Sequence, residues 1–249
     1  MSVAASELEL RSRETSGAEE ESLDIPASLS DSASVIACDL DDVLCQTNLA
    51  VAEWHNEQYG TNMTLDDFYY HYYWKNPYWG GIQETFTKVT ELYKTDRLYE
   101  AAPIPGAREG VQALRDMGFK LIIVTARVRK FKKGRGHGSK HIFLVCAKLN
   151  ARLLIDDSSE NALQLVTTLS EPIPVLLFGQ YEWNKRISSH ADSVESMVFE
   201  NRLQIEGGRE FWKEERFEDH IPDGAQIRRV KDWEEVVEWV KTARAENRL

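Results

Sequence analysis

The chain of 249 residues is long enough for one α/β domain of ordinary size with an insertion, and such a domain buries a core without disulfides or structural metals. A formal net charge of -11 argues against a general nucleic-acid binder, which needs a basic surface to contact phosphates. The three cysteines fit neither a disulfide framework nor a metal site, and no apolar run could span a bilayer, so we expect a soluble cytoplasmic protein without membrane partners.

The first segment, residues 1–32, is rich in serine, alanine and glutamate and shows no apolar periodicity. A segment of this composition cannot bury enough apolar surface to offset the entropy that it would lose on ordering. We therefore expect a disordered N-terminal tail before the folded domain.

The apolar run 35–38 ends in three acids, Asp39, Asp41 and Asp42. Such a run is typical of a central strand in a parallel sheet, and the sites of open α/β folds lie beyond the carboxyl ends of these strands. Carboxylates in a partly dry cleft repel one another unless a cation neutralises them, and oxygen ligands favour Mg²⁺. The alternative is a strand that simply runs into an acidic turn.

Residues 47–99 show helical spacing and no strand pattern, which predicts a small helical cap inserted after the first strand. Thr47 can cap its first helix, Gly60 can stop that helix, and Thr64 starts a capping-box motif. The many aromatic residues of the insertion fit either its own core or the lining of a ligand pocket. We single out Trp74 as a substrate-binding candidate because it lies in a turn-rich stretch.

Two later apolar runs also end in polar residues. The run 119–124 is followed by Thr125, whose hydroxyl suits a phosphate oxygen when backbone amides of a turn lie beside it. The run 151–155 is followed by Asp156 and Asp157 and then by a helical pattern. Parallel strands joined by right-handed crossovers bring their carboxyl ends to one edge, so we expect these side chains to meet the acids of the first strand.

The remaining patterns complete the same architecture. Residues 172–178 indicate a further strand, and residues 232–240 indicate a helix whose apolar stripe we assign to packing on the domain. Lys185 and Arg186 lie in a polar loop, where they fit either contact with an anionic substrate or plain solvation. Together the patterns predict an α/β fold, a Rossmann-like parallel sheet with a small helical cap.

Three segments, in this order, resemble motifs I, II and IV of the haloacid dehalogenase-like (HAD-like) hydrolases. They are Asp-Leu-Asp-Asp-Val-Leu beginning at Asp39, Leu-Ile-Ile-Val-Thr-Ala-Arg ending at Arg127, and Leu-Leu-Ile-Asp-Asp ending at Asp157. The helical insertion resembles the cap of that superfamily, and the chain looks most similar to 5′(3′)-deoxyribonucleotidase-like phosphatases. It departs from the pattern at Asp42, where many relatives have glycine.

The resemblance implies that Asp39 is the nucleophile and Asp41 the general acid and base. It also implies that Mg²⁺ is held by Asp39, by the backbone carbonyl of Asp41, and by Asp156 or Asp157. These roles agree with the chemistry, because a carboxylate can attack phosphorus only when a cation neutralises the like charges. A general acid favours a phosphatase over a dehalogenase, since the loss of halide needs no proton.

The resemblance further implies that Thr125 and the backbone amide of Ala126 hold the phosphoryl group, and we add Arg127 of the same motif to the substrate-binding candidates. A lysine is expected in motif III, but the stretch after Arg127 is basic, rich in glycine and short. Lys140 is our catalytic candidate and Lys148 the second choice, because Lys140 precedes the helix expected before the third strand. A solvated basic loop is the alternative.

We therefore predict a Mg²⁺-dependent phosphomonoester hydrolase that acts through an aspartyl-phosphate on a small phosphorylated metabolite, with 5′-nucleotides as one candidate class. Its parts are the tail over 1–32, a HAD-like core over 33–46 and 100–249, and the helical cap over 47–99. The alternative is a catalytically weak protein of the same fold that binds a phosphorylated ligand or partner, which the altered motif III region favours. The sequence does not define the oligomeric state.

Overall fold

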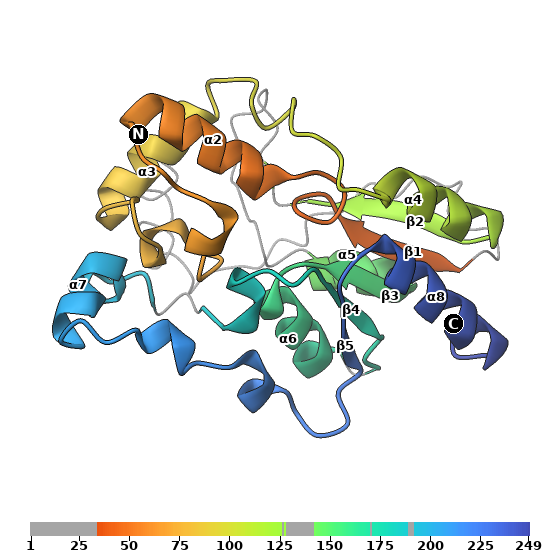
Figure 1. Ribbon diagram of the computed structural model, residues 1–249. Coiled ribbons are helices and arrows are strands. Elements are labelled where there is room, and N and C mark those ends of the chain that lie inside the picture. The colour runs from red at the N-terminus through yellow and green to blue at the C-terminus, as the bar shows by residue number, and fades with distance from the viewer. Residues whose placement is uncertain (1–33, 126, 128–141, 170, 189–191) are drawn as a thin grey trace, which may run out of the picture.

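The computed structural model describes residues 34–125, 127, 142–169, 171–188 and 192–249 (Figure 1). The expected N-terminal tail and two of the candidate site residues, Ala126 and Lys140, lie outside these described residues. In the part of the chain that is described, no helix has both the length and the apolar character needed to cross a bilayer.

A five-stranded parallel sheet forms the centre of the molecule, which confirms the predicted α/β fold class. The strand order is β2-β1-β3-β4-β5, so the first strand lies between the second and the third. Helical crossovers allow all these neighbours to run parallel. The strands span Val35–Asp39 (β1), Lys120–Val124 (β2), Ala151–Asp156 (β3), Val175–Phe178 (β4) and Ile227–Val230 (β5).

Helices cover both faces of this sheet (Figure 1). Alternate side chains of a strand point to opposite faces, so Ile36 and Cys38 pack with α4 and α8, whereas Val35 and Ala37 pack with α5 and α6. Burial on both faces explains the unbroken apolar run of β1. The four helices span Ala107–Asp116 (α4), Ile142–Lys148 (α5), Ser159–Thr168 (α6) and Trp233–Ala245 (α8).

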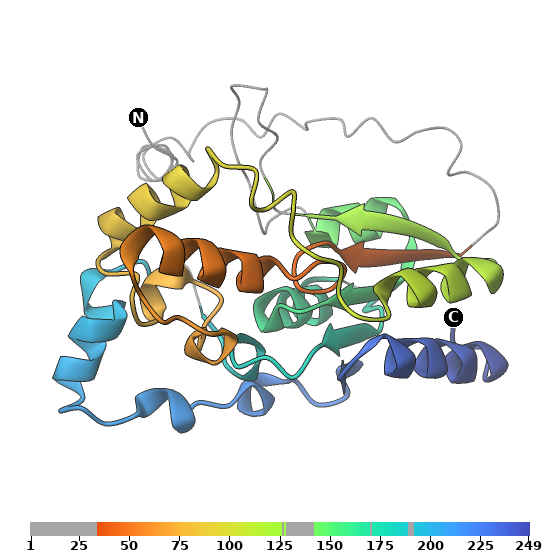
Figure 2. The ribbon, with the colours of Figure 1, turned by 45° about the horizontal axis from the view of Figure 1, so that its top comes forward.

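The segment between β1 and α4 is helical and contains no strand, as described over residues 40–106. It consists of α2 (Thr47–Tyr59), α3 (Ile82–Leu92) and two 3-10 turns, Leu65–Asp67 and Tyr73–Lys75. Figure 2 shows the arrowheads of β1 and β2 directed toward the side where α2 and α3 lie. The insertion therefore stands at the carboxyl edge of the sheet. The boundaries predicted for core and cap stay a prediction.

Part of the chain between β4 and β5 supports the insertion. Tyr70 of the insertion packs in one cluster with Phe199 of α7 (Phe199–Ile205) and with Trp212. The ring of Tyr69 stacks on that of Trp212 with centroids 4.6 Å apart. Within the described residues of this region, 3-10 turns lie at Trp183–Lys185, Glu195–Met197, Phe211–Lys213 and Phe217–His220.

The strand β5 was not among the predicted elements. Its sequence, Ile-Arg-Arg-Val, places Arg228 and Arg229 in the middle of the strand, so it lacks an apolar run. It lies at the edge of the sheet and pairs only with β4 among the described strands. An edge strand needs one buried side at most, which is why polar residues are tolerated here.

Candidate active site

The carboxyl ends of β1, β2 and β3 lie side by side. Asp39 is in register with the residue that precedes Thr125. Cys38 is in register with Ile155, so Asp156 is the next residue beside Asp39. The sheet thus brings the polar strand ends together at one edge.

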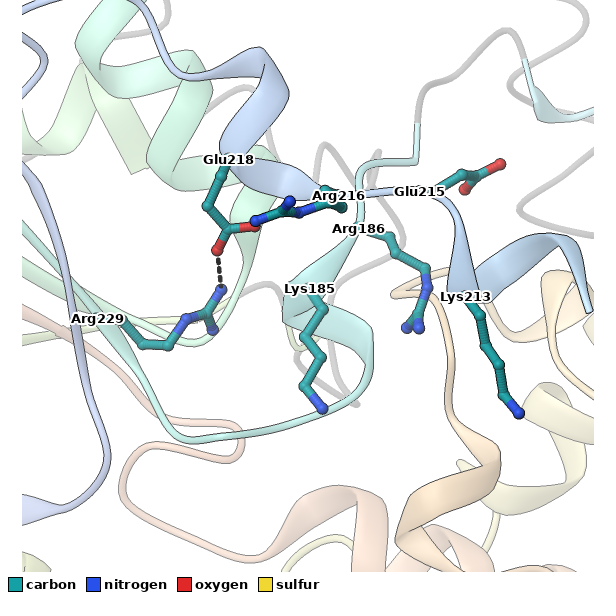
Figure 3. Close-up of a pocket in the computed structure, with 7 residues that line it drawn as sticks. All are labelled: Lys185, Arg186, Lys213, Glu215, Arg216, Glu218 and Arg229. Atoms are coloured by element: carbon teal, nitrogen blue, oxygen red, sulfur yellow. Dashed lines mark hydrogen bonds and ion pairs between the residues drawn. The ribbon is translucent and has the colours of Figure 1, made fainter.

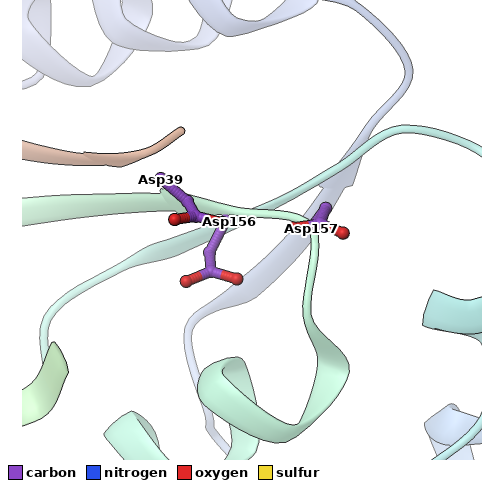
Figure 4. A group of neighbouring side chains, drawn as sticks. All are labelled: Asp39, Asp156 and Asp157. Carbon is purple, nitrogen blue, oxygen red and sulfur yellow. The ribbon is translucent and has the colours of Figure 1, made fainter. Parts of the chain in front are cut away.

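Three carboxylates form a compact group at this edge (Figure 4). One oxygen from each of Asp39, Asp156 and Asp157 lies within 4.8 Å of the other two. The residues are buried, with 8%, 0% and 4% of their surfaces exposed. We call this set the carboxylate group.

Burial raises the pKa of each member of the carboxylate group, and repulsion from neighbouring acids raises the pKa of Asp39 and Asp157 further. Burial raises the pKa of Asp39 well above its ordinary value, and the charges of Asp156 and Asp157 raise it further. Burial and then the charges of Asp42 and Asp156 do the same to the pKa of Asp157. The pKa of Asp156 rises to about 6, mainly because of burial. A bound cation would lower the cost of ionising these acids, so the donor set fits a hard divalent ion such as Mg²⁺.

Neighbouring groups hold the two acids at the end of β3. The backbone N–H of Ser158 donates to Asp156 Oδ1 at 2.8 Å, and Asn161 Nδ2 donates to both oxygens of Asp156 at 3.3 and 3.1 Å. The indole Nε1 of Trp183 donates to Asp157 Oδ2 at 2.6 Å. Sequence reasoning assigned no role to Asn161 or Trp183. The position of Asn161 at the start of α6, just after the two acids, could have indicated its role. Trp183 lies in a loop that is polar in sequence, and nothing there indicates a contact with Asp157.

Asp41 lies outside the carboxylate group, and an arginine contacts it. Arg127 Nε and Thr47 Oγ1 both donate to Asp41 Oδ1, at 2.7 and 2.6 Å. Thr125 Oγ1 donates to the other oxygen at 3.4 Å. Arg127 Nη1 also donates to the carbonyl of Leu98 at 2.8 Å. Two of the candidate phosphate contacts, Thr125 and Arg127, therefore meet at the candidate acid and base.

Asp42 links the turn after β1 to the first helix of the insertion. Its φ of 52° lies in the left-handed region that favours glycine, which accounts for the glycine of many relatives at this position. Its carboxylate accepts the N–H of Asn48 in the first turn of α2 at 3.0 and 3.2 Å, and burial raises its pKa to about 8. The prediction that Thr47 caps α2 was wrong, because Thr47 is the first helical residue and its hydroxyl is bonded to Asp41.

Two aromatic side chains from distant parts of the chain anchor the same turn. The hydroxyl of Tyr181 donates to the carbonyl of Asp42 at 2.9 Å, and Nε1 of Trp233 donates to the carbonyl of Val43 at 2.9 Å. The ring of Tyr181 also stacks on that of Trp183, with centroids 4.1 Å apart. The Tyr181–Trp183 pair thus connects the turn after β1 with Asp157.

A family model described as haloacid dehalogenase-like hydrolase matches residues 33–149. The match supports an enzyme of the HAD-like hydrolase type. The matched range holds Asp39, Asp41 and Thr125 and ends before the acids of β3. A search of curated proteins gave no match.

Several solved structures are similar in outline. A HAD-like family hydrolase from Streptococcus pneumoniae is 13% identical and gives a TM-score of 0.49, with 84% of this chain and 98% of that chain covered. A predicted phosphatase from Clostridium acetobutylicum is 14% identical with a TM-score of 0.48, covering 84% and 99%. A HAD family hydrolase from Deinococcus radiodurans with bound phosphate and sodium is 14% identical with a TM-score of 0.45, covering 86% and 96%. At TM-scores below 0.5 these likenesses add nothing to the functional case.

Tyr73, in a 3-10 turn of the insertion, is one of the aromatic residues near the acids. Its hydroxyl donates to Asn48 Oδ1 at 3.1 Å, and burial followed by the charge of Asp42 raises its pKa well above the ordinary value. Trp74 instead donates from Nε1 to the carbonyl of Asp192 at 3.3 Å, and none of its described contacts involves an acid of the site. A substrate contact by Trp74 stays a prediction.

The position of α5 bears on the choice between Lys140 and Lys148 as the expected motif III lysine. Lys148 is the exposed last residue of that helix and leads into the amino end of β3. Because a strand rises about 3.3 Å per residue, this end is on the order of 16 Å from the carboxylate group. Lys140 lies outside the described residues, so a role for Lys140 stays a prediction.

Proposed function

We propose that the chain hydrolyses phosphate monoesters of small metabolites, with Mg²⁺ as cofactor and Asp39 as nucleophile. The observation that carries this proposal is the placement of two kinds of acid at one sheet edge. Asp39 belongs to a buried carboxylate group suited to a cation, whereas Asp41 is held separately by Thr47, Thr125 and Arg127. Phosphoryl transfer through a carboxylate needs two different acids. One is an ionised nucleophile whose charge a cation offsets, and the other carries the proton.

Asp39, Asp156 and Asp157 would hold Mg²⁺. The ion would supply the positive charge that offsets the repulsion between an anionic nucleophile and a phosphate dianion. Hydrogen bonds to Asp156 and Asp157 from their neighbours fix the acids in place before any ligand arrives.

The first step joins Asp39 to phosphorus while the bond from phosphorus to the leaving alcohol oxygen breaks. Asp41 gives its proton to that oxygen. In the second step Asp41 takes a proton from water, whose oxygen attacks the phosphorus of the aspartyl-phosphate. Asp39 and inorganic phosphate are released, and both acids return to their initial states.

The donors around Asp41 suit the same reaction. Phosphoryl oxygens are alternative acceptors for the guanidinium of Arg127 and the hydroxyl of Thr125, both of which now contact Asp41. A substrate that takes over these contacts would free the Asp41 carboxyl for proton transfer. We place 5′-nucleotides first among the substrates to be tested, on the basis of the nucleotidase-like sequence pattern.

The test is a phosphate-release screen across nucleoside 5′-monophosphates and sugar phosphates, with Mg²⁺ and with a chelator. Wild type should turn over at least one substrate class with Mg²⁺ only, and Asp39→Asn should show no turnover while its circular dichroism stays that of the wild type. Substantial Mg²⁺-dependent release by Asp39→Asn would reject the nucleophile. Ligand binding without turnover in the wild type would favour the non-catalytic alternative.

A further inference from the structure

A second concave site lies on the β5 side of the molecule (Figure 3). It has a volume of about 450 Å³, within the usual range for pockets that hold small molecules. Its walls come from the loop after β4, from the segment between α7 and β5, and from β5 itself. We call it the basic pocket, and its lining residues are Lys185, Arg186, Lys213, Glu215, Arg216, Glu218 and Arg229.

The positive charge of the basic pocket is only partly compensated. Glu182 is the acceptor for both Lys185 and Arg186, so two cations share one carboxylate. Lys213 pairs with Glu210 at 2.7 Å. Neither of these carboxylates belongs to the lining, and each lies three or four residues from its partner in sequence.

The remaining lining residues do not restore neutrality. Glu215 is bonded to the hydroxyl of Tyr70 at 2.6 Å and pairs with Arg202, which is outside the pocket. Glu218 meets Arg229 at 3.4 Å, the dashed contact in Figure 3. Arg216 is exposed and forms no ion pair among the described residues. Two positive charges therefore remain in excess, in a chain whose net charge is -11.

Some of these cations are held in place. Arg186 is 5% exposed, and its guanidinium donates to the carbonyls of Trp212 and Glu182, so its position does not depend on a ligand. Arg229 donates to the carbonyl of Asn184 at 3.1 Å. The lysine side chain of Lys213 is less constrained than the two guanidinium groups, since 63% of it is exposed. Fixed guanidinium groups with adjustable ammonium groups suit an oxyanion.

The lining also indicates what kind of anion fits. All seven lining residues are charged, so no aromatic ring is present in the lining to stack on a base. A ligand must therefore be recognised by charge, and an excess of two positive charges matches a dianion or a longer phosphate chain. We propose that the basic pocket binds a small phosphate-rich anion of the pyrophosphate type, separately from the carboxylate group.

The experiment titrates inorganic pyrophosphate into the full chain by calorimetry, with a chelator present so that the carboxylate group carries no cation. The test variant is the double substitution Lys185→Gln and Arg216→Gln, and the matched controls are Lys241→Gln and its pairing with Lys94→Gln, exposed lysines of α8 and of the turn after α3. We expect one site whose affinity falls at least tenfold in the test variant and less than twofold in the controls.

A rise in ionic strength should weaken this binding, because the contacts are between charges at an open surface. Pyrophosphate affinity that is the same in Asp39→Asn and in wild type would support a site separate from the acids, whatever the outcome for catalysis. No heat of binding at millimolar pyrophosphate, or a test variant that binds like its controls, would overturn the proposal. Thermal melts of each variant check that the fold is kept.

Discussion

Replacing Asp157 by asparagine is expected to stabilise the protein in the absence of metal. Asp157 is 4% exposed, and burial and neighbouring charges raise its pKa well above 3.8. Protonation of Asp157 therefore favours the folded state. This stability is fully present below pH 3.8 and is lost as the pH rises, because the folded state keeps the proton to a higher pH than the unfolded chain does. Asparagine is neutral at every pH and keeps an oxygen that can accept from Trp183 Nε1.

The distance within the carboxylate group gives the size of the effect. Two full charges at the upper limit of 4.8 Å repel by about 3.5 kcal/mol at an effective dielectric constant of 20. Partial protonation lowers the repulsion that is left at neutral pH, so we expect a gain of about 1 to 3 kcal/mol in the free energy of unfolding. For a chain of this size each kcal/mol corresponds to an increase in Tm of roughly 2 to 4 °C.

The assay is thermal unfolding followed by circular dichroism at pH 8, with a chelator and again with Mg²⁺. Wild type should gain stability from Mg²⁺, because ion binding stabilises the folded state, and Asp157→Asn should gain much less. The exposed Asp223 provides the matched control, and Asp223→Asn should follow the wild type in both conditions. A lower Tm of Asp157→Asn in chelator, or an undiminished response to Mg²⁺, would refute the electrostatic account.

Three further substitutions test the surroundings of the site. Trp183→Phe removes the indole donor to Asp157 and keeps a ring, so Mg²⁺ affinity measured by calorimetry should fall roughly tenfold, and an unchanged affinity would exclude this role. Lys140→Ala should slow phosphate release at least roughly tenfold, or about 1.4 kcal/mol of barrier, whereas Lys148→Ala should have little effect, and the opposite order would transfer the role. Burial and then a nearby lysine lower the pKa of His55 from 6.5 to about 4, so stability with Mg²⁺ should fall between pH 6.5 and 4 by on the order of 3 kcal/mol. His55→Gln should flatten that part of the pH profile in thermal melts.

The strands that are buried on both faces could be predicted from sequence because their burial requires continuous apolar runs. β1 and β4 are buried over their whole length and β3 is buried except at Arg152, and the polar residues that end β1 and β3 mark where the runs leave the core. β5 escaped prediction because it pairs at the sheet edge and carries two arginines. Without an apolar run, β5 gives no strand signal in the sequence.

The candidate site could be predicted only in part from the sequence. Acids at strand ends can be named from spacing, but the residues that contact them come from distant loops, as with Trp183 on Asp157 and Arg127 on Asp41. Trp74 and its neighbour Tyr73 show the limit, because the three-residue turn Tyr73–Lys75 is too short for a periodic pattern to indicate where either ring points. Side-chain direction in such turns is set by tertiary packing.

The contacts that anchor the turn after β1 affect when this turn becomes ordered during folding. Its contacts with Arg127, Tyr181 and Trp233 bridge 86, 139 and 190 positions of the chain. Contacts between residues so far apart in sequence form slowly, because long loops must close before they contribute. During synthesis on the ribosome, the nucleophile and its strand would emerge early, yet the turn that holds the proton carrier would become rigid only after α8 has docked. Enzymatic activity is therefore expected to appear as one of the last events of folding, which makes it a sensitive reporter of a completed fold.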